Sequence, residues 1–66
     1  MNIAENIKKL RTENGLTQSE LGDICGFSMN AIYNYENNKR TPILENVIIL
    51  ADLFGITLDE LVKGEF

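Results

Sequence analysis

Apolar residues recur along the chain with the spacing of amphipathic helices. Ile3, Ile7 and Leu10 are spaced i, i+4 and i+7, which places them on one face of a helix. Four further segments show helical patterning, and no segment alternates apolar and polar residues as a half-buried strand does. The pattern predicts an all-α fold of five helices, over residues 3–13, 17–25, 28–37, 44–54 and 57–63.

Residues that begin and end helices flank these segments. Thr17 and Thr57 are each followed three residues later by a glutamate, which is the pattern of a capping box, and Ser28 is a favourable N-cap. A glycine follows four of the five segments, and Asn38 takes the corresponding place after the third. Pro42 breaks the chain before the fourth segment. Because the connections are short, the sequence predicts a single compact domain over residues 1–66.

The predicted core consists of one apolar face from each helix. A chain of 66 residues buries only about 60% of the surface that its unfolded form exposes, so its stability margin is thin. The residues expected in the core are Ile7, Leu10, Leu16, Leu21, Cys25, Phe27, Ile32, Tyr35, Leu44, Val47, Leu50, Ala51, Phe54, Ile56, Leu58 and Leu61.

The second and third segments meet the requirements of two helices that cross through a tight turn. A small side chain is needed where the helices approach closely, and Gly22 provides it. The turn needs a residue that readily adopts a positive φ, and Gly26 provides that. The third segment begins with polar residues, Ser28, Asn30 and Asn34, that could meet base edges. A helix with such a face can enter the DNA major groove.

The charge of the chain is unevenly distributed. The net charge is −4, which looks unfavourable for binding DNA. Residues 1–44 contain five cations and five anions, whereas residues 45–66 contain Lys63 against five anions. Distribution matters more than the total for facing phosphates. We therefore expect the N-terminal part to face DNA and the acidic C-terminal part to face away from it.

Composition excludes several classes of protein and site. Histidine is absent and Cys25 is the single cysteine, so the sequence predicts no internal disulfide and no zinc site. Cys25 lies at an apolar helical position, where a buried small hydrophobe is the favoured interpretation. No segment has the apolar run of a signal peptide, and residues 47–51 are too few to span a bilayer. We expect a cytoplasmic protein with no membrane contact, no cofactor and no small-molecule ligand.

Three stretches together resemble a known family. They are IKKLRTENGLTQSELGDICGFS (7–28), AIYNYENNKRTP (31–42) and ADLFGITLDEL (51–61). The chain is similar over residues 3–63 to the XRE-type family, the phage repressor and Cro-like helix-turn-helix proteins. The resemblance implies a five-helix repressor-like domain that binds DNA sequence-specifically. The function it implies is a transcriptional regulator, a repressor, that binds a (pseudo)palindromic operator as a homodimer with the third helix in the major groove.

The resemblance also implies roles for particular residues. Asn30 and Asn34 lie one turn apart, and asparagine can pair bidentately with adenine. No arginine or lysine lies on this face, so we hypothesise an operator whose contacted bases are mainly A·T. The residues that match base-contact positions are Met29, Asn30, Tyr33 and Asn34; Tyr33 could instead reach a phosphate. The expected phosphate contacts are Arg11, Thr17, Gln18, Ser28, Asn37, Lys39 and Arg40.

The chain departs from the family pattern near its C-terminal end. Ile43 stands where a serine-like cap is usual, and it cannot cap. Ile49 and Leu53 are apolar where the family often has polar or small residues. An exposed apolar patch on a small protein usually marks an interaction surface. We expect Ile49, Leu53, Val62 and Phe66 to form a two-fold dimer contact, with packing inside the monomer as the alternative.

Two other functions are weighed against DNA binding. The chain could be a protein-interaction module that has this fold without binding DNA, which the acidic balance and the apolar Met29 and Tyr33 would favour. An enzyme is disfavoured because the sequence offers no histidine, no paired catalytic acids, no activated nucleophile and no phosphate-binding loop. A salt-dependent gel shift separates a DNA-binding regulator from an interaction module.

Overall fold

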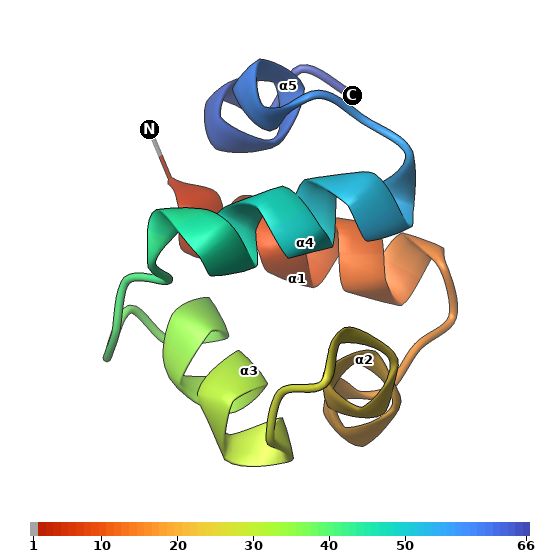
Figure 1. Ribbon diagram of the computed structural model, residues 1–66, viewed down its shortest axis with the longest axis vertical. Coiled ribbons are helices and arrows are strands. Elements are labelled where there is room, and N and C mark those ends of the chain that lie inside the picture. The colour runs from red at the N-terminus through yellow and green to blue at the C-terminus, as the bar shows by residue number, and fades with distance from the viewer. Residues whose placement is uncertain (1) are drawn as a thin grey trace.

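The computed structural model describes residues 2–66, and this part of the chain folds into helices without a strand (Figure 1). The all-α prediction of five helices is confirmed; the second, third and fifth helices each begin one residue later than expected, and the third also ends one residue earlier. Met1, which the predicted domain includes, lies outside the described residues. The helices are α1 (Ile3–Glu13), α2 (Gln18–Cys25), α3 (Met29–Glu36), α4 (Leu44–Phe54) and α5 (Leu58–Lys63).

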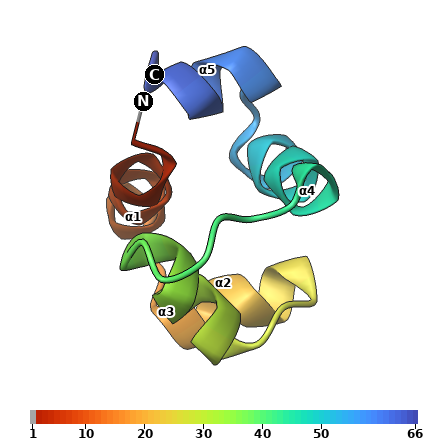
Figure 2. The ribbon, with the colours of Figure 1, turned by 90° about the vertical axis from the view of Figure 1, so that its left-hand side faces the viewer.

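The helices surround a single core. In Figures 1 and 2, α1 and α4 cross the middle of the molecule, with α2 and α3 below them and α5 above. α2 packs against α3, and α1 packs against both α3 and α5. The side-chain amide of Asn6 donates to the carbonyl oxygen of Leu61 at 2.8 Å, which ties α1 to the last turns of the chain. The helix-turn-helix pair therefore lies at the end of the molecule opposite α5.

Most of the predicted core is confirmed. Nine of the predicted core residues are buried, and Leu16, Cys25, Phe27, Phe54, Ile56 and Leu58 are half-buried against them. Ala4 is also buried and was missed. The buried apolar residues are Ala4, Ile7, Leu10, Leu21, Ile32, Tyr35, Val47, Leu50, Ala51 and Leu61.

The prediction for Leu44 is wrong, because this side chain is 63% exposed. Leu44 lies in the first turn of α4, one turn before the first core residue of that helix, Val47. Pro42 is buried at this end of α4 instead. The apolar periodicity of α4 therefore extends one turn beyond the core.

The predicted N-caps are confirmed. The hydroxyl of Thr17 accepts a hydrogen bond from the N–H of Glu20 at 3.0 Å, and the Glu20 carboxylate accepts one from the N–H of Thr17 at 2.9 Å. Thr57 begins α5 with the same reciprocal pair. Ile43 makes no side-chain cap for α4, as expected. Each helix except α4 is thus begun by a polar side chain, including α1, where Asn2 accepts from the N–H of Glu5 at 3.2 Å.

Cys25 packs as a small apolar residue. It is half-buried beside the core, and burial raises the pKa of its thiol above the usual value. A raised pKa keeps the thiol protonated and unreactive. The structure therefore supports the packing interpretation of Cys25.

Among residues 2–66, no helix is both long enough and apolar enough to cross a bilayer.

Candidate nucleic-acid interface

The turn between α2 and α3 depends on two glycines, in the roles that the sequence predicts. A Cβ atom on Gly22 would lie 2.7 Å from the backbone oxygen of Phe27, so any side chain there would collide with the turn. Gly26 has a φ of 77°, in the left-handed region that favours glycine. The N–H of Phe27 donates to the carbonyl oxygen of Gly22 at 2.7 Å and closes the turn. These contacts fix the angle at which α3 leaves α2.

Packing determines which side of α3 faces outward. Ile32 and Tyr35 are buried in the core, and the Tyr35 ring meets Phe27 edge-to-face, with the ring centroids 6.3 Å apart. The Tyr35 hydroxyl accepts a hydrogen bond from the side-chain amide of Asn46 on α4 at 3.0 Å. The opposite side of α3 is left exposed. We call Met29, Asn30, Tyr33 and Asn34 the outer face of α3.

The outer face of α3 holds all four predicted base-contact residues. Met29 is 56% exposed and Tyr33 is 42% exposed. Asn30 is exposed as well, while Asn34 is half-buried. The structure thus brings the predicted base-contact residues together, and their contact with DNA stays a prediction.

A buried carboxylate joins α1, α2 and α3. The side chain of Glu36 is 1% exposed, and its two oxygens accept from Nε and Nη2 of Arg11 at 2.6 and 3.0 Å. Gln18 of α2 donates to the same carboxylate at 3.1 Å, so its side-chain amide is partly engaged with α3, and its phosphate contact stays a prediction. Three hydrogen bonds, two from Arg11 and one from Gln18, satisfy the buried carboxylate and hold α3 in place.

This arrangement changes the interpretation of Arg11. Its third nitrogen, Nη1, donates to the carbonyl oxygen of Leu16 at 2.8 Å, and the side chain is only 12% exposed. Every nitrogen of the guanidinium therefore has a partner inside the protein. The guanidinium uses three of its five N–H groups to hold α1 to α3 and to the loop before α2, and the phosphate contact predicted for Arg11 stays a prediction.

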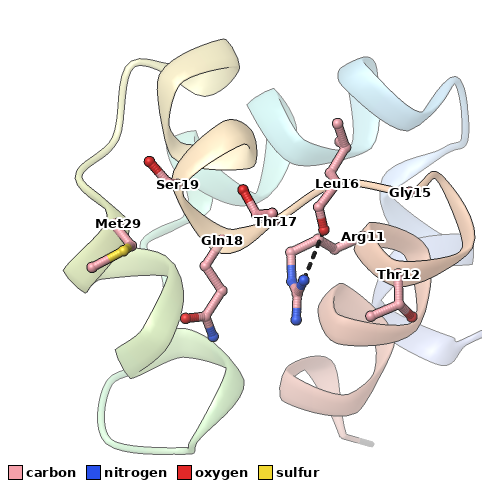
Figure 3. A pocket seen from close by; sticks show the side chains of 8 residues that line it. All are labelled: Arg11, Thr12, Gly15, Leu16, Thr17, Gln18, Ser19 and Met29. Carbon is pink, nitrogen blue, oxygen red and sulfur yellow. Dashed lines mark hydrogen bonds between the residues drawn. The ribbon is translucent and has the colours of Figure 1, made fainter.

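An open groove of about 550 Å³ lies at the N-terminal end of α2 (Figure 3). The first turn of a helix leaves N–H groups without intrahelical partners, and in α2 these belong to Gln18 and Ser19. Such a helix end favours an anion. The groove is lined by Arg11, Thr12, Gly15, Leu16, Thr17, Gln18, Ser19 and Met29, so it adjoins the outer face of α3.

The loop after α3 is held tightly against that helix. The N–H groups of Lys39 and Arg40 both donate to the carbonyl oxygen of Asn34, at 3.0 and 3.2 Å. The Asn37 side chain donates to the carbonyl oxygen of Tyr33 at 2.8 Å. Asn38 has the positive φ, 57°, that the sequence predicts. Lys39 and Arg40 are exposed, so this ordered loop presents two cations beside α3.

Comparison with known proteins assigns the chain to a family. The profile described as Helix-turn-helix matches residues 7–61, which is most of the chain. The chain belongs to this helix-turn-helix family. The match includes α2, the turn and α3, and it confirms the family resemblance of the sequence.

Relatives of this helix-turn-helix chain are named as regulators. It is 35% identical over 65 residues to the HTH-type transcriptional activator BcrR of Enterococcus faecalis, and this match spans 98% of the chain and 32% of BcrR. It is 33% identical over 61 residues to the cryptic phage CTXphi transcriptional repressor RstR of Vibrio cholerae, spanning 92% of the chain and 54% of RstR. The chain thus covers about a third to about half of these proteins. The names agree with a regulator rather than an enzyme.

Solved structures share the fold. The P22 c2 repressor in complex with synthetic operator 9T superposes with a TM-score of 0.87 and 30% identity, covering 97% of both chains. The solution structure of the DNA-binding domain of the same repressor gives a TM-score of 0.90 at 29% identity, covering 98% of this chain and 86% of the other. The five-helix, repressor-like fold is therefore confirmed.

The residues predicted for a dimer contact do not lie together. Ile49 and Leu53 are 40% and 37% exposed on α4. Val62 is half-buried and packs on the core. Phe66 is exposed, and its ring lies 5.6 Å from Nζ of Lys9, so the chain end lies on the α1 side of α5 while α4 lies on the other (Figure 2). Within the predicted set, Ile49 and Leu53 are the pair that shares a helix face.

Sequence reasoning missed other exposed apolar side chains. Ile43, Leu44 and Ile48 are 61%, 63% and 42% exposed. The signal was present in the sequence, because residues 43–44 and 47–50 contain more apolar residues than one helix face can bury. Leu44 and Ile48 form one flank of α4, and Ile49 and Leu53 form the other. We call these four residues the outer surface of α4.

Proposed function

We propose that this helix-turn-helix domain binds double-stranded DNA sequence-specifically. Its proposed role is that of a transcriptional regulator, a repressor that acts at a (pseudo)palindromic operator. The observation that carries the proposal is the outer face of α3, which is exposed while the opposite side of the helix is locked into the core. The names of RstR and of the P22 c2 repressor complex support the same function. In this proposal α3 lies in the major groove.

The side chains of the outer face favour A·T base pairs. Asn30 and Asn34 present amides that can bond adenine through N6 and N7, and Met29 can pack on thymine methyl groups. α3 contains no arginine or lysine, the residues that most often read guanine. We therefore propose half-sites in which the contacted bases are mainly A·T.

Phosphates would be bound on both sides of α3. On one side lie the free N–H groups of the first turn of α2, with Thr17 and Gln18, and Ser28 begins α3 next to them. On the other side lie Asn37, Lys39 and Arg40. Arg11 lines the groove at the start of α2, and its guanidinium could reach a phosphate with the N–H groups that it does not use for Glu36 and Leu16. The acidic helix α5 lies at the end of the molecule opposite α3 (Figure 1), which lessens repulsion.

We further propose that the domain binds as a homodimer. Few cations face DNA, so one subunit should bind weakly, and two subunits would place their α3 helices roughly 34 Å apart in successive major grooves. Ile49 and Leu53 are the proposed centre of the two-fold contact, with Val62 and Phe66 farther away. Sedimentation of Ile49→Asp/Leu53→Asp should show a monomer, with Ile48→Asp on the other flank of α4 as the control. If the double variant remains a dimer, this proposal is wrong.

In vitro selection of bound DNA from a random duplex library tests the function directly. The expected result is enrichment of A·T-rich half-sites in inverted repeat. Asn30→Ala should lose the enriched positions, and the matched variant Asp52→Asn on α4 should keep them. Enrichment of guanine-dominated half-sites that are lost on Asn30→Ala would contradict the A·T proposal, and no enrichment at all would contradict DNA binding.

One observation favours a second function. The outer surface of α4 exposes four aliphatic side chains on two flanks, with the carboxylates of Glu45 and Asp52 exposed between them, as expected of a module that binds another protein. A domain that uses only this surface would bind no DNA. A gel shift against genomic fragments that shows no retardation at low salt would favour this alternative.

A further inference from the structure

We propose that Tyr33 is a positioning residue that acts through Lys39. Its ring holds the Lys39 ammonium at the C-terminal end of α3, where the ammonium binds a DNA phosphate. This inference rests on the proposed function and differs from the base contact that the family resemblance implies for Tyr33. It assigns Tyr33 to backbone binding and leaves Met29, Asn30 and Asn34 to the bases.

The two side chains are already in contact in the free protein. Nζ of Lys39 lies 5.5 Å from the centroid of the Tyr33 ring. A cation within about 6 Å of an aromatic face is attracted by the negative charge of that face. One face of the Tyr33 ring is therefore occupied by an ammonium before DNA arrives.

The backbone beneath this contact is fixed at both ends. Tyr33 lies in the last full turn of α3, and its carbonyl oxygen accepts from the N–H of Asn37 at 3.0 Å and from the Asn37 side chain at 2.8 Å. The N–H of Lys39 donates to the carbonyl oxygen of Asn34 at 3.0 Å. Because the loop is fixed on α3, the position of the ammonium depends mainly on the Lys39 side chain, which the ring restrains.

The location also suits a cation. The C-terminal end of a helix carries a partial negative charge, and the last turn of α3 contains no basic residue of its own. Lys39 supplies that charge from the loop. The ring therefore keeps the ammonium at the edge of α3 that would adjoin the DNA backbone if α3 lies in the major groove.

Ordering this lysine matters because nearby cations are scarce. Arg11 is bound to Glu36, and Lys9 lies over Phe66 at the α5 side of the molecule. Lys39 and Arg40 are the cations that follow α3 directly. A lysine side chain loses much rotamer freedom when it is immobilised, and a side chain that is already restrained loses less on binding. The Tyr33 ring thus raises the contribution of one of the two cations that directly follow α3.

Separate substitutions test the hydroxyl and the ring of Tyr33. Tyr33→Phe keeps the ring and should bind DNA as the wild-type protein does. Tyr33→Leu removes the ring and should weaken binding about two- to fivefold, the range expected for an exposed cation–π contact. In a Lys39→Gln background, Tyr33→Leu should have no further effect, because the ring acts only through the ammonium.

The experiment is a fluorescence anisotropy titration with a labelled mixed-sequence duplex of about two helical turns, over a series of salt concentrations. Phosphate contacts set the salt dependence, so Lys39→Gln should reduce the slope of log K against log salt by roughly 0.9. Tyr33→Leu should reduce it in the same direction, and circular dichroism should show both variants folded. In the free protein, the Lys39 ε-methylene protons should show an upfield NMR shift that Tyr33→Phe keeps and Tyr33→Leu loses.

The outcomes separate this inference from the proposed function. If Tyr33→Leu weakens binding equally with and without Lys39, or Tyr33→Phe weakens it as much as Tyr33→Leu, then Tyr33 contacts DNA itself and the inference is overturned. If the lysine shift is absent from the wild-type protein, the contact does not exist in solution. If the wild-type protein binds no duplex at any salt, the proposed function fails, and the inference fails with it.

Discussion

The two exposed helix surfaces of this molecule differ in kind. The outer face of α3 carries two amides, a methionine and a tyrosine beside a loop with two cations, whereas the outer surface of α4 carries four aliphatic side chains. Residues 1–44 have balanced charges, while residues 45–66 hold the whole acidic excess. The first surface suits a polar, negatively charged partner and the second suits an apolar one. One small domain can therefore separate DNA binding from protein contact.

The two regions also differ in how their helices are held. α2 and α3 begin at side-chain caps, and both are joined to the buried Arg11–Glu36 ion pair, α3 through Glu36 itself and α2 through the hydrogen bond of Gln18. α4 begins at Ile43 without a side-chain cap, although its backbone there matches the capped positions. The caps and the ion pair therefore hold the helices beneath the outer face of α3, the surface proposed to bind DNA. Small displacements of that surface would lose contacts with the bases. Four predictions follow this difference, from the largest effect to the smallest.

Removal of the buried carboxylate should have the largest effect on stability. Glu36→Ala leaves Arg11 buried without its counter-charge, which should cost about 3 kcal/mol of unfolding free energy. Thermal denaturation followed by circular dichroism measures the loss, with the exposed Glu13→Ala as control. The double variant Arg11→Met/Glu36→Leu should recover most of the stability, because it removes both charges. If it is no more stable than Glu36→Ala, the unpaired charge is not the cause of the lost stability.

A methyl group at the helix-turn-helix crossing should have the next largest effect. Gly22→Ala places a Cβ atom 2.7 Å from the backbone oxygen of Phe27, so the turn must shift, at a cost of about 1–3 kcal/mol. Urea denaturation measures it, and Ser19→Ala on the exposed part of α2 should change little. Equal stability of the two variants would show that the turn adjusts freely.

The missing cap of α4 should allow a gain in stability. Ile43 has φ −67° and ψ 158°, close to the values at Thr57, and it is 61% exposed. Ile43→Ser should therefore stabilise the domain by about 1 kcal/mol, while Thr57→Ala should destabilise it by about the same amount. Urea denaturation compares them. A loss of stability in Ile43→Ser would mean that the isoleucine packs more than its exposure indicates.

The capping box of α2 should give a small dependence of stability on pH. Hydrogen bonds from the backbone and side chain of Thr17 lower the pKa of Glu20 from 4.5, so the folded state favours the charged carboxylate. That stabilisation is present above pH 4.5 and is lost as the pH falls through the folded-state pKa. Urea denaturation at a series of pH values should show that Glu20→Gln loses less stability at acid pH than the wild-type protein does. Identical pH profiles of the two proteins would contradict this prediction.

Much of the fold was predictable because helix ends have local causes. Capping boxes and the glycines that follow four of the helices depend on neighbouring residues, so the bounds of α2 and α5 follow from sequence. The excess of apolar residues in α4 indicated that some of them must be exposed, but periodicity alone did not show that Leu44 is one of them, because it does not show where the core ends. The position of Arg11 depends on Glu36, 25 residues away, and the contact of Lys39 with Tyr33 depends on the loop conformation. These long-range arrangements need the folded chain.

The central claim is that α3 and its adjoining loop bind DNA while the α4 surface does not. Titration of the isotope-labelled domain with the selected duplex, followed by amide chemical-shift changes in NMR spectra, tests it most directly. The account predicts the largest changes at Gln18, at residues 29–34 and at residues 37–40, with changes on α4 confined to those of a dimer contact at Ile49 and Leu53. Chemical-shift changes that occur on α4 and leave residues 29–34 unaffected would contradict it.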